Sequence, residues 1–255
     1  MSTDSLTENY TRIHFDTIDS TNEEAKRRIL AGEDKPLLLW ADEQTAGKGR
    51  NGRSFYSPNS TGIYFTYLYP NAEKKSIDKL VFVTTVAAVS VCEALIEFAR
   101  ADAEIKWIND IYIHGRKVCG ILAEVAYKED VPGIVTGIGI NLSTEDFPAE
   151  IQSIASGVGS FDKEELKILK ENILTKVGDD LHAFFDAGDD PSFRKDIIER
   201  YKAHSLVIGK DIAYSFADGE KHRAKALDIL PDGSLLVRGE EGEIVLNSGE
   251  IHLHL

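Results

Sequence analysis

The chain has 255 residues and a formal net charge of −14, from 43 acidic and 29 basic side chains. This balance argues against a general nucleic-acid binder, because neutralising phosphates needs a basic face. The length suits one sizeable domain with a smaller one attached. We expect no signal peptide and no window that approaches the ~20 apolar residues of a membrane span, and we expect Cys92 and Cys119 to be reduced and structural.

The first hundred residues alternate predicted helices and strands. Residues 18–32 predict a helix, with Asp, Ser and Thr available to cap its start and a glycine to end it. Two apolar, partly β-branched runs predict strands at residues 36–44 and 61–70. Apolar residues recur at helical spacing over residues 77–100, which predicts the clearest helix of the chain.

The rest of the chain predicts more strands, then two helices, then a β-rich tail. The strands are expected at residues 103–110, 111–113, 117–125 and 133–142, and the helices at residues 163–186 and 192–203. From about residue 206, short strands alternate with turns rich in Gly and Asp, a pattern typical of a small β-barrel or sandwich. We therefore expect two domains, residues 1–204 and residues 205–255.

The stretch QTAGKGRNGRSF, residues 44–55, combines three glycines with three cations. Its glycines match G-x-G-x-x-G, but a dinucleotide fingerprint needs a helix that begins inside the motif. The following residues, RSFYSPNSTG, cannot begin a helix, so we reject that interpretation. We expect a mobile loop that closes around an anion with the charges of Lys48, Arg50 and Arg53. A solvated basic hairpin loop without a ligand stays the alternative.

The segment KWIND, residues 106–110, carries polar side chains beside a tryptophan. In a strand, Lys106 and Ile108 would share one face and Asn109 would lie on the other. Asn109 can read a base or a ribose, and Asp110 can hold Mg²⁺ or orient a lysine. Taken alone, the segment is better explained as a strand end followed by an Asn-Asp turn.

Two other residues occupy positions that need an explanation. Lys117 enters an apolar strand, where an ammonium group is costly without an anionic partner. It can face an anion carried by a ligand, or lie in water at the end of a hairpin. Asn141 follows a glycine-containing strand, a pattern that permits close approach of an adenine or phosphate, or a tight strand crossing. This inventory of cations and amides suits reactions between anions, such as nucleotidyl transfer.

Five motifs in this order resemble those of the biotin–protein ligases. They are DSTN at residues 19–22, QTAGKGRNGR at 44–53, KWIND at 106–110, RKVCGIL at 116–122 and GIGIN at 137–141. The resemblance implies an α+β fold: a mixed-sheet catalytic domain with flanking helices, class II synthetase-like, of the biotin/lipoate ligase type. The β-rich tail is similar to the family's small C-terminal SH3-like β-barrel.

The sequence departs from the family pattern at two positions and in one absence. Lys48 replaces the usual arginine, which keeps the charge but loses the planar fork, and Ile108 replaces proline. We expect activity with altered affinity. Barely 15 residues precede the region of resemblance, so the chain resembles the monofunctional type without a DNA-binding domain.

The resemblance implies that biotin and ATP·Mg²⁺ form biotinyl-5′-AMP, from which biotin passes to a lysine of a biotin carboxyl carrier protein. Lys117 and Arg50 are the expected catalytic residues, and Asp110 is the candidate metal ligand. The expected biotin-contacting residues are Ser20, Thr21, Asn22, Gln44, Lys48, Gly49, Arg50 and Lys117. The expected ATP-contacting residues are Arg50, Arg53, Phe55, Lys106, Asn109 and Asn141, and Phe55 or Tyr64 would cover the ligand.

We further expect a cytoplasmic protein that can form a homodimer, with neither nucleic acid nor a membrane as partner. The nearest alternative function is a lipoate or octanoate ligase or transferase, which shares the general fold and the acyl chemistry. An alternative from another class is a non-catalytic biotin-binding regulator.

Overall fold

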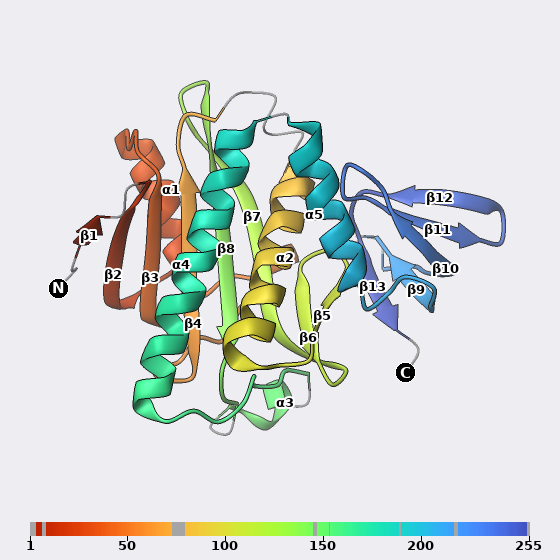
Figure 1. Cartoon of the computed structure of the whole chain (residues 1–255), viewed down its shortest axis with the longest axis horizontal. Helices are drawn as coiled ribbons and strands as arrows, with labels where there is room; N and C mark the ends of the chain where they lie inside the picture. The colour runs from red at the N-terminus through yellow and green to blue at the C-terminus, as the bar shows by residue number, and fades with distance from the viewer. Residues whose placement is uncertain are drawn as a thin grey trace.

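The computed structural model of the chain describes residues 4–6, 9–72, 80–144, 147–152, 154–188, 190–216 and 219–253. An eight-stranded sheet with the order β1-β2-β3-β4-β8-β7-β6-β5 forms its centre (Figure 1). The strands are β1 (Asp4–Leu6), β2 (Thr11–Ile18), β3 (Leu37–Gln44), β4 (Gly62–Tyr69), β5 (Ala103–Lys106), β6 (Asp110–Ile113), β7 (Arg116–Lys128) and β8 (Val131–Asn141). Strands β2 and β3 are parallel and the other neighbouring pairs are antiparallel, so the sheet is mixed.

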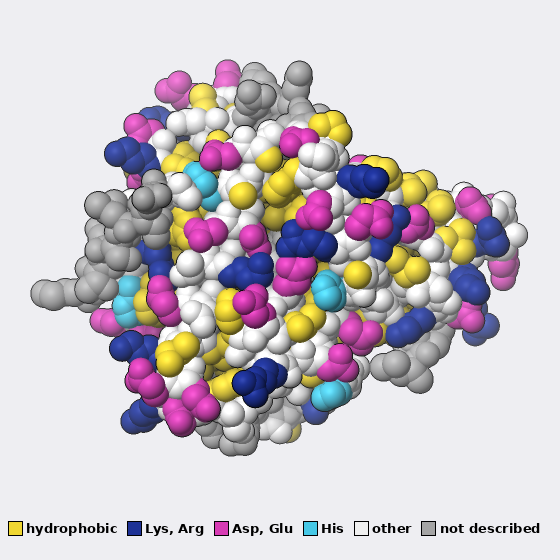
Figure 2. Space-filling view, viewed as in Figure 1, with side chains coloured by type: hydrophobic (Ala, Val, Ile, Leu, Met, Phe, Trp, Pro, Cys, Tyr) yellow, Lys and Arg dark blue, Asp and Glu magenta, His cyan; other side chains and the backbone are white. Residues whose placement is uncertain are grey.

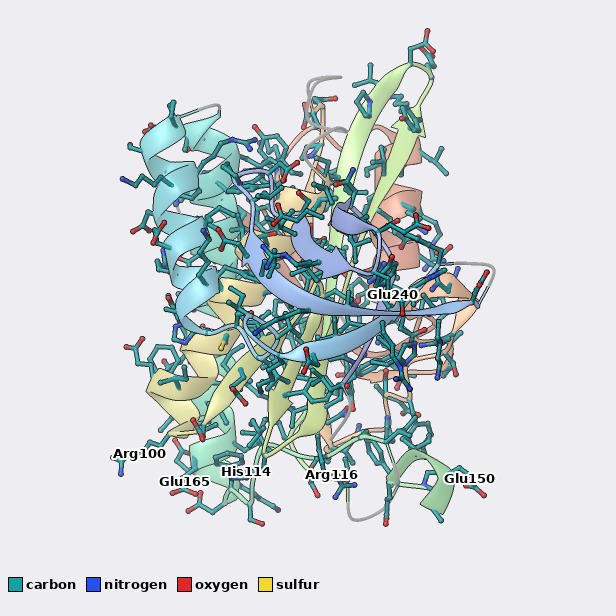
Figure 3. All side chains as sticks on the ribbon, turned by 90° about the vertical axis from the view of Figure 1, so that its right-hand side faces the viewer. Arg100, His114, Arg116, Glu150, Glu165 and Glu240 are labelled. Carbon is teal, nitrogen blue, oxygen red and sulfur yellow. The ribbon has the colours of Figure 1, made fainter. Side chains whose placement is uncertain are left out.

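Helices cover both faces of this sheet. On one face lie α2 (Leu80–Ala99), α4 (Lys163–Ala187) and α5 (Pro191–Ala203), and on the other lies α1 (Thr21–Ala31). Figure 3 shows α1 on the side of the sheet away from the other three helices. The outer surface of α2, α4 and α5 carries interspersed acidic and basic side chains (Figure 2). The short α3 (Ala149–Gln152) lies at one end of the sheet.

Helix α1 begins and ends as the sequence predicts. The Ser20 side chain caps it by accepting a hydrogen bond from the backbone N–H of Glu23, and Gly32 ends it with φ of 96°, a left-handed conformation that glycine adopts easily. Ala25 and Ile29, one turn apart, are buried against the sheet. Since α1 connects two parallel strands, its first turn lies at the carboxyl ends of β2 and β3.

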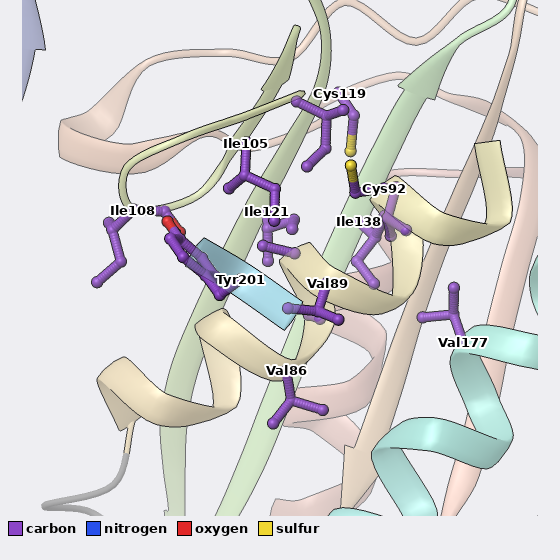
Figure 4. Close-up of a cluster of buried hydrophobic side chains, with 14 of the residues drawn as sticks. Val86, Val89, Cys92, Ile105, Ile108, Cys119, Ile121, Ile138, Val177 and Tyr201 are labelled. Atoms are coloured by element: carbon purple, nitrogen blue, oxygen red, sulfur yellow. The ribbon is translucent and has the colours of Figure 1, made fainter. Parts of the chain in front are cut away.

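Helix α2 is apolar over a longer stretch than the sequence led us to expect of any segment. Its 20 residues are long and apolar enough to cross a membrane, so the expectation that no segment meets this test was wrong. However, 72% of its apolar window is buried inside the protein, between the sheet and helices α4 and α5. Figure 4 shows Val86, Val89 and Cys92 of this helix within the main core. A helix buried on nearly all sides is apolar all round for that reason.

Both cysteines lie in the same core. Cys92 and Cys119 are free and fully buried, as fits structural thiols (Figure 4). Burial raises the pKa of the Cys92 thiol to about 12 and raises that of Cys119 as well. Both side chains therefore stay as thiols at neutral pH, because the thiolate is the reactive form and burial disfavours it.

The other predicted helices and strands begin and end within three residues of the observed bounds, with one exception. Residues 77–79 of the predicted long helix lie outside the described residues. The predicted strand at 103–110 was wrong in its second half, because Trp107, Ile108 and Asn109 form the turn between β5 and β6. The two apolar turn residues are buried by distant segments: Trp107 Nε1 donates to the Gly233 carbonyl at 3.0 Å. Burial by tertiary contacts, not by a strand, explains their apolar character.

The β-rich tail forms a second, five-stranded antiparallel sheet with the order β12-β11-β10-β9-β13. Its strands are β9 (Asp211–Ser215), β10 (Lys221–Ile229), β11 (Leu235–Gly239), β12 (Gly242–Leu246) and β13 (Glu250–Leu253). This confirms a small all-β C-terminal unit. Its apolar residues, such as Ile212 and Leu235, join the core that α2 and α5 bury, so the two sheets pack together. The domain boundary near residue 204 stays a prediction.

Candidate active site

The segment from Thr45 to Tyr56, called the glycine loop below, forms most of the connection between β3 and β4, which contains no α-helix. Its backbone folds on itself: Gly49 N donates to Arg53 O at 2.7 Å, and Phe55 N donates to Gly47 O at 2.9 Å. A single 3-10 turn, η1 (Arg50–Gly52), makes the bend. This confirms that the motif is not a dinucleotide fingerprint. The closure of the loop around an anion stays a prediction.

The glycine loop meets the β5–β6 turn and β7 in one hydrogen-bonded chain, called the central cluster below. Arg50 Nη1 donates to Asn109 Oδ1 at 2.7 Å, and Asn109 Nδ2 donates to Asp110 Oδ1 at 3.0 Å. Lys117 Nζ donates to the same Asp110 oxygen at 2.7 Å. The β6–β7 hairpin brings Asp110 and Lys117 side by side, with an irregular register between Ile111 and Tyr112. Both expected catalytic residues thus lie in one cluster.

Lys117 has an internal anionic partner. Neither interpretation of Lys117 itself gave it such a partner, since one placed it against a ligand and the other in water; only the second role weighed for Asp110, orienting a lysine, allowed for it. Its side chain is 32% exposed, so it is only partly desolvated, and the Asp110 carboxylate compensates its charge. Of the two roles weighed for Asp110, the geometry has it orienting a lysine. Its role as a metal ligand stays a prediction.

Further cations extend the central cluster toward the C-terminal sheet. Lys106 Nζ donates to the Tyr112 hydroxyl at 3.2 Å, and burial lowers the pKa of this lysine against the opposing effect of Asp110. Arg53 forms a two-point ion pair with Glu250, the first residue of β13. A chain of net charge −14 therefore gathers its cations locally, as an anionic ligand requires.

Phe55 lies directly on the backbone of β7 and β8. Gly120 and Gly139 are register partners in these strands, and a Cβ added at Gly139 would lie 2.5 Å from the Phe55 ring. The glycines therefore permit close approach, and in this structure the half-buried Phe55 ring makes it. Tyr64 is fully buried in edge-to-face contact with Phe55, so Phe55 is the better placed of the two to cover a ligand.

Beside the central cluster, the first turn of α1 is held in a buried hydrogen-bond network, called the α1 network below. Gln44 Oε1 accepts from the backbone N of Thr21 at 2.9 Å and from its hydroxyl at 3.1 Å. The Thr66 hydroxyl lies 2.7 Å from both Thr21 Oγ1 and Asn22 Oδ1. Asn22 Nδ2 donates to Glu124 at 2.9 Å. Three of the residues expected to contact biotin are thus interconnected.

The other expected biotin contacts lie at the edge of this network. Ser20 is buried as the cap of α1. Lys48 forms an ion pair with Glu23 of α1 at 2.7 Å, and this bond, followed by one from Lys26, lowers the pKa of Glu23. Lys48 is therefore held against α1. Gly49 contributes backbone only, and its N–H is used inside the loop.

Asn141 ends β8 opposite Gly62. Its Oδ1 is buried, and among the described residues it has no hydrogen-bond partner. Leaving a buried carbonyl unpaired costs about 1–3 kcal/mol, so such an atom marks a place where a donor from outside can bind. This fits the expected contact to the adenylate.

Sequence reasoning missed several members of the site. The missed residues are Glu23, Ser57, Thr66, Glu124 and Glu250. Thr66 carried a signal, because it is a polar residue in the middle of an otherwise apolar buried strand. Glu250 carried none, since it lies 197 positions from its partner Arg53.

A possible metal cluster lies elsewhere. His14, Asp16 and Asp42, on β2 and β3, place one ligand atom each within 4.8 Å of one another. His14 is already bonded to Asp42 at 3.0 Å, and Lys170 lies 3.9 Å from the same carboxylate. None of the three belongs to the α1 network or to the central cluster, so they have no part in the candidate active site.

The matching family model is the biotin/lipoate A/B protein ligase family, over residues 14–141. The chain is 32% identical over 247 residues to the bifunctional ligase/repressor BirA of Bacillus subtilis, covering 94% of this chain and 73% of that protein. It is 27% identical to the biotin–[acetyl-CoA-carboxylase] ligase of Mycobacterium tuberculosis, covering 92% of this chain and 86% of that enzyme.

The solved structures agree with these sequence relatives. The biotin protein ligase from Aquifex aeolicus in complex with biotin and ATP superposes with a TM-score of 0.76 at 27% identity, covering 96% of this chain and 98% of that one. The expected α+β fold, with a mixed sheet, flanking helices and a small β-rich C-terminal unit, is thereby confirmed. The chain belongs to the biotin/lipoate A/B protein ligase family, and within it to the biotin protein ligases.

Proposed function

We propose that this chain is an ATP-dependent biotin–[acetyl-CoA-carboxylase] ligase that works in two steps. In the first step, the biotin carboxylate attacks the α-phosphate of ATP, forming biotinyl-5′-AMP and releasing pyrophosphate. In the second, the amine of a lysine on the biotin carboxyl carrier protein attacks the acyl carbon, forming an amide and releasing AMP. The central cluster carries this proposal, because it places two cations on one carboxylate–amide pair.

The first step brings a carboxylate against a negatively charged phosphate. Lys117 leaves Asp110 and bridges the biotin carboxylate and the α-phosphate, while Arg50 neutralises the charge that develops. Positive groups fixed before the reaction stabilise such charge, and removing one typically costs about 10²–10³ in rate. Asp110 holds Lys117 in position, so the ammonium is already oriented when the substrates arrive.

The ureido ring of biotin needs both donors and acceptors. Thr21, Asn22 and Gln44 of the α1 network, with the Ser20 cap, supply hydroxyl and amide groups at one place. The glycines of β7 and β8 leave a flat backbone surface on which the thiophane ring and the valeryl chain can lie once Phe55 moves aside.

ATP lies on the side of Arg53 and Lys106. Asn109 and the unpaired Oδ1 of Asn141 face the adenosine, and Phe55 covers it. Asp110 is the carboxylate that would help to hold Mg²⁺, most of whose ligands phosphates usually supply in such sites. When bound, the ion would neutralise charge on the phosphates.

The acyl-adenylate is vulnerable to hydrolysis, so water must be excluded until the carrier lysine arrives. The glycine loop serves this purpose by closing over the ligand with Arg50, which is why cations and glycines occur together in it. Localisation in the cytoplasm, homodimer formation and the absence of a nucleic-acid partner stay predictions.

Two other functions compete with that of a biotin ligase. A lipoate or octanoate ligase shares the family model, but two relatives that each cover over 90% of this chain are named as biotin–[acetyl-CoA-carboxylase] ligases. A non-catalytic biotin-binding regulator would not need a lysine beside the phosphate subsite.

Transfer of labelled biotin to a carrier domain, with and without ATP, tests the function. We expect ATP-dependent labelling that unlabelled biotin abolishes and unlabelled lipoate leaves intact. Competition by lipoate would favour the lipoyl alternative, and biotin binding without ATP consumption would favour the regulator.

A further inference from the structure

Arg53 and Glu250 join the glycine loop to the C-terminal sheet. Nη1 donates to Oε1 and Nη2 donates to Oε2, both at 2.8 Å, across 197 positions of sequence. A two-point pair fixes the direction of the guanidinium as well as its distance. Glu250 thereby fixes the direction of the nucleotide-side arginine in this structure.

The exposure of the pair decides what it can do. The Arg53 side chain is 66% exposed and that of Glu250 is 39% exposed. A pair in so much water contributes little to the stability of a fold, so it is unsuited to act as a strut. For the same reason it is easily exchanged when a stronger anion arrives.

Glu250 lies among cations that the nucleotide would meet. The Arg53 guanidinium lowers the pKa of the Glu250 carboxyl, and His252 and Lys106 add to this effect while partial burial opposes it. Glu250 is therefore an anion at neutral pH. Since Arg53 and Lys106 both belong to the expected ATP contacts, this carboxylate occupies the kind of cationic surroundings that suit a phosphate.

We propose that Glu250 is the resident anion of the nucleotide side: it holds Arg53 before ATP binds and releases it to the phosphates of ATP. A triphosphate carries more charge than one carboxylate and displaces it from the guanidinium. The inference rests on the proposed function. Glu250 then acts as a positioning residue through Arg53, and it couples the C-terminal sheet to the glycine loop.

The variant Glu250→Gln tests this by removing the charge at nearly constant size. We expect the KM for ATP to fall about two- to five-fold, the range that an exposed ion pair supports, with kcat and biotin affinity unchanged. Glu243→Gln is the matched control, because Glu243 pairs with Arg238 at 2.7 Å on the same sheet with both side chains at least half exposed. It should leave the KM for ATP unchanged.

A second background separates the mechanism from a general charge effect. In an Arg53→Gln chain, Glu250→Gln should no longer lower the KM, because its effect passes through Arg53. An equal fall in both backgrounds would overturn the proposal. A rise in KM for Glu250→Gln would overturn it too, since the pair would then hold Arg53 in its productive place, and so would an unchanged KM.

Calorimetric titration of the full chain with ATP separates this proposal from the proposed function. Tighter ATP binding by Glu250→Gln, in a chain that fails to transfer biotin, would support the resident anion and contradict the ligase. Normal biotin transfer with unaltered ATP binding would support the ligase and contradict the resident anion.

Discussion

The α1 network and the nucleotide-side cations surround the same site but are built in opposite ways. In the network, neutral hydroxyl and amide groups such as those of Thr21, Asn22 and Thr66 are buried and bonded to one another. On the other side, Arg53 and Lys117 are partly exposed and pair with carboxylates. The network suits a neutral ring that must be recognised by shape, and the cations suit anions that arrive and leave.

The energies of the two kinds of contact support this division. Leaving a buried polar group unpaired costs about 1–3 kcal/mol, so the α1 network resists change. An exposed ion pair is worth about 0–1 kcal/mol, so the cations exchange partners readily. If biotin and ATP bind as proposed, biotin would meet a rigid surface, whereas ATP would meet charges that reorganise around it.

The largest effect is expected from Lys117→Ala. It removes the ammonium between the two reacting anions, and the rate of biotin-dependent ATP–pyrophosphate exchange should fall at least about a hundredfold. Biotin affinity, measured by calorimetry, should change far less because the α1 network stays intact. Lys128→Ala, at the exposed far end of β7, is the control and should keep normal exchange. Near-normal exchange by Lys117→Ala would show that the Lys117 ammonium takes no part in adenylate formation.

The second-largest effect is expected from Gly137→Ala, which disrupts the α1 network. A Cβ at Gly137 would collide with the amide of Asn22, so the α1 network must shift. We expect a loss of about 1–3 kcal/mol in the free energy of unfolding, measured with urea, and weaker biotin binding at unchanged ATP affinity. Gly159→Ala is the control, since its Cβ would meet Phe161 at an ordinary 3.6 Å. Unchanged biotin binding would show that the network does not recognise biotin.

The smallest effect concerns the Lys48–Glu23 pair at the border between the two sides. Hydrogen bonds from Lys48 and then Lys26 lower the pKa of Glu23, so its stabilising effect is present above the unfolded pKa of about 4.3 and disappears as pH falls through the lower folded value. Because the pair is partly exposed, Glu23→Gln should cost at most about 1 kcal/mol at pH 7. The difference in unfolding free energy from the original chain should vanish in acid.

A difference that persists at low pH would contradict the ion-pair origin of this effect. Glu129→Gln, in the exposed turn after β7, serves as the control and should leave the free energy of unfolding at pH 7 unchanged.

Local patterns were enough to predict most of the fold. The cap and end of α1, the two strands around the glycine loop and the long apolar helix all follow from spacing and turn residues. The error at Trp107 and Ile108 has a physical cause, because a distant carbonyl and α5 bury these turn residues. No periodicity reports contacts of that range.

The candidate site was foreseen in its residue types more than in its pairings. Lys117, Arg50 and Asn109 were each predicted as site residues. Asp110, which links Lys117 to Asn109, was predicted to hold a metal or to orient a lysine, and the sequence did not decide between these two roles. Glu124 and Glu250 were not predicted as site residues. An acidic residue on a strand is ordinarily taken to be solvent-exposed, and only the structure reveals its partner.

The proposed mechanism depends most on one change of partner: Lys117 must leave Asp110 and bind the biotin carboxylate and the α-phosphate. A crystal structure of the chain with biotin and a non-hydrolysable ATP analogue tests this directly. We predict Lys117 Nζ within about 3 Å of both the biotin carboxylate and the α-phosphate. An ammonium still 2.7 Å from Asp110, with both ligands bound elsewhere, would contradict the account.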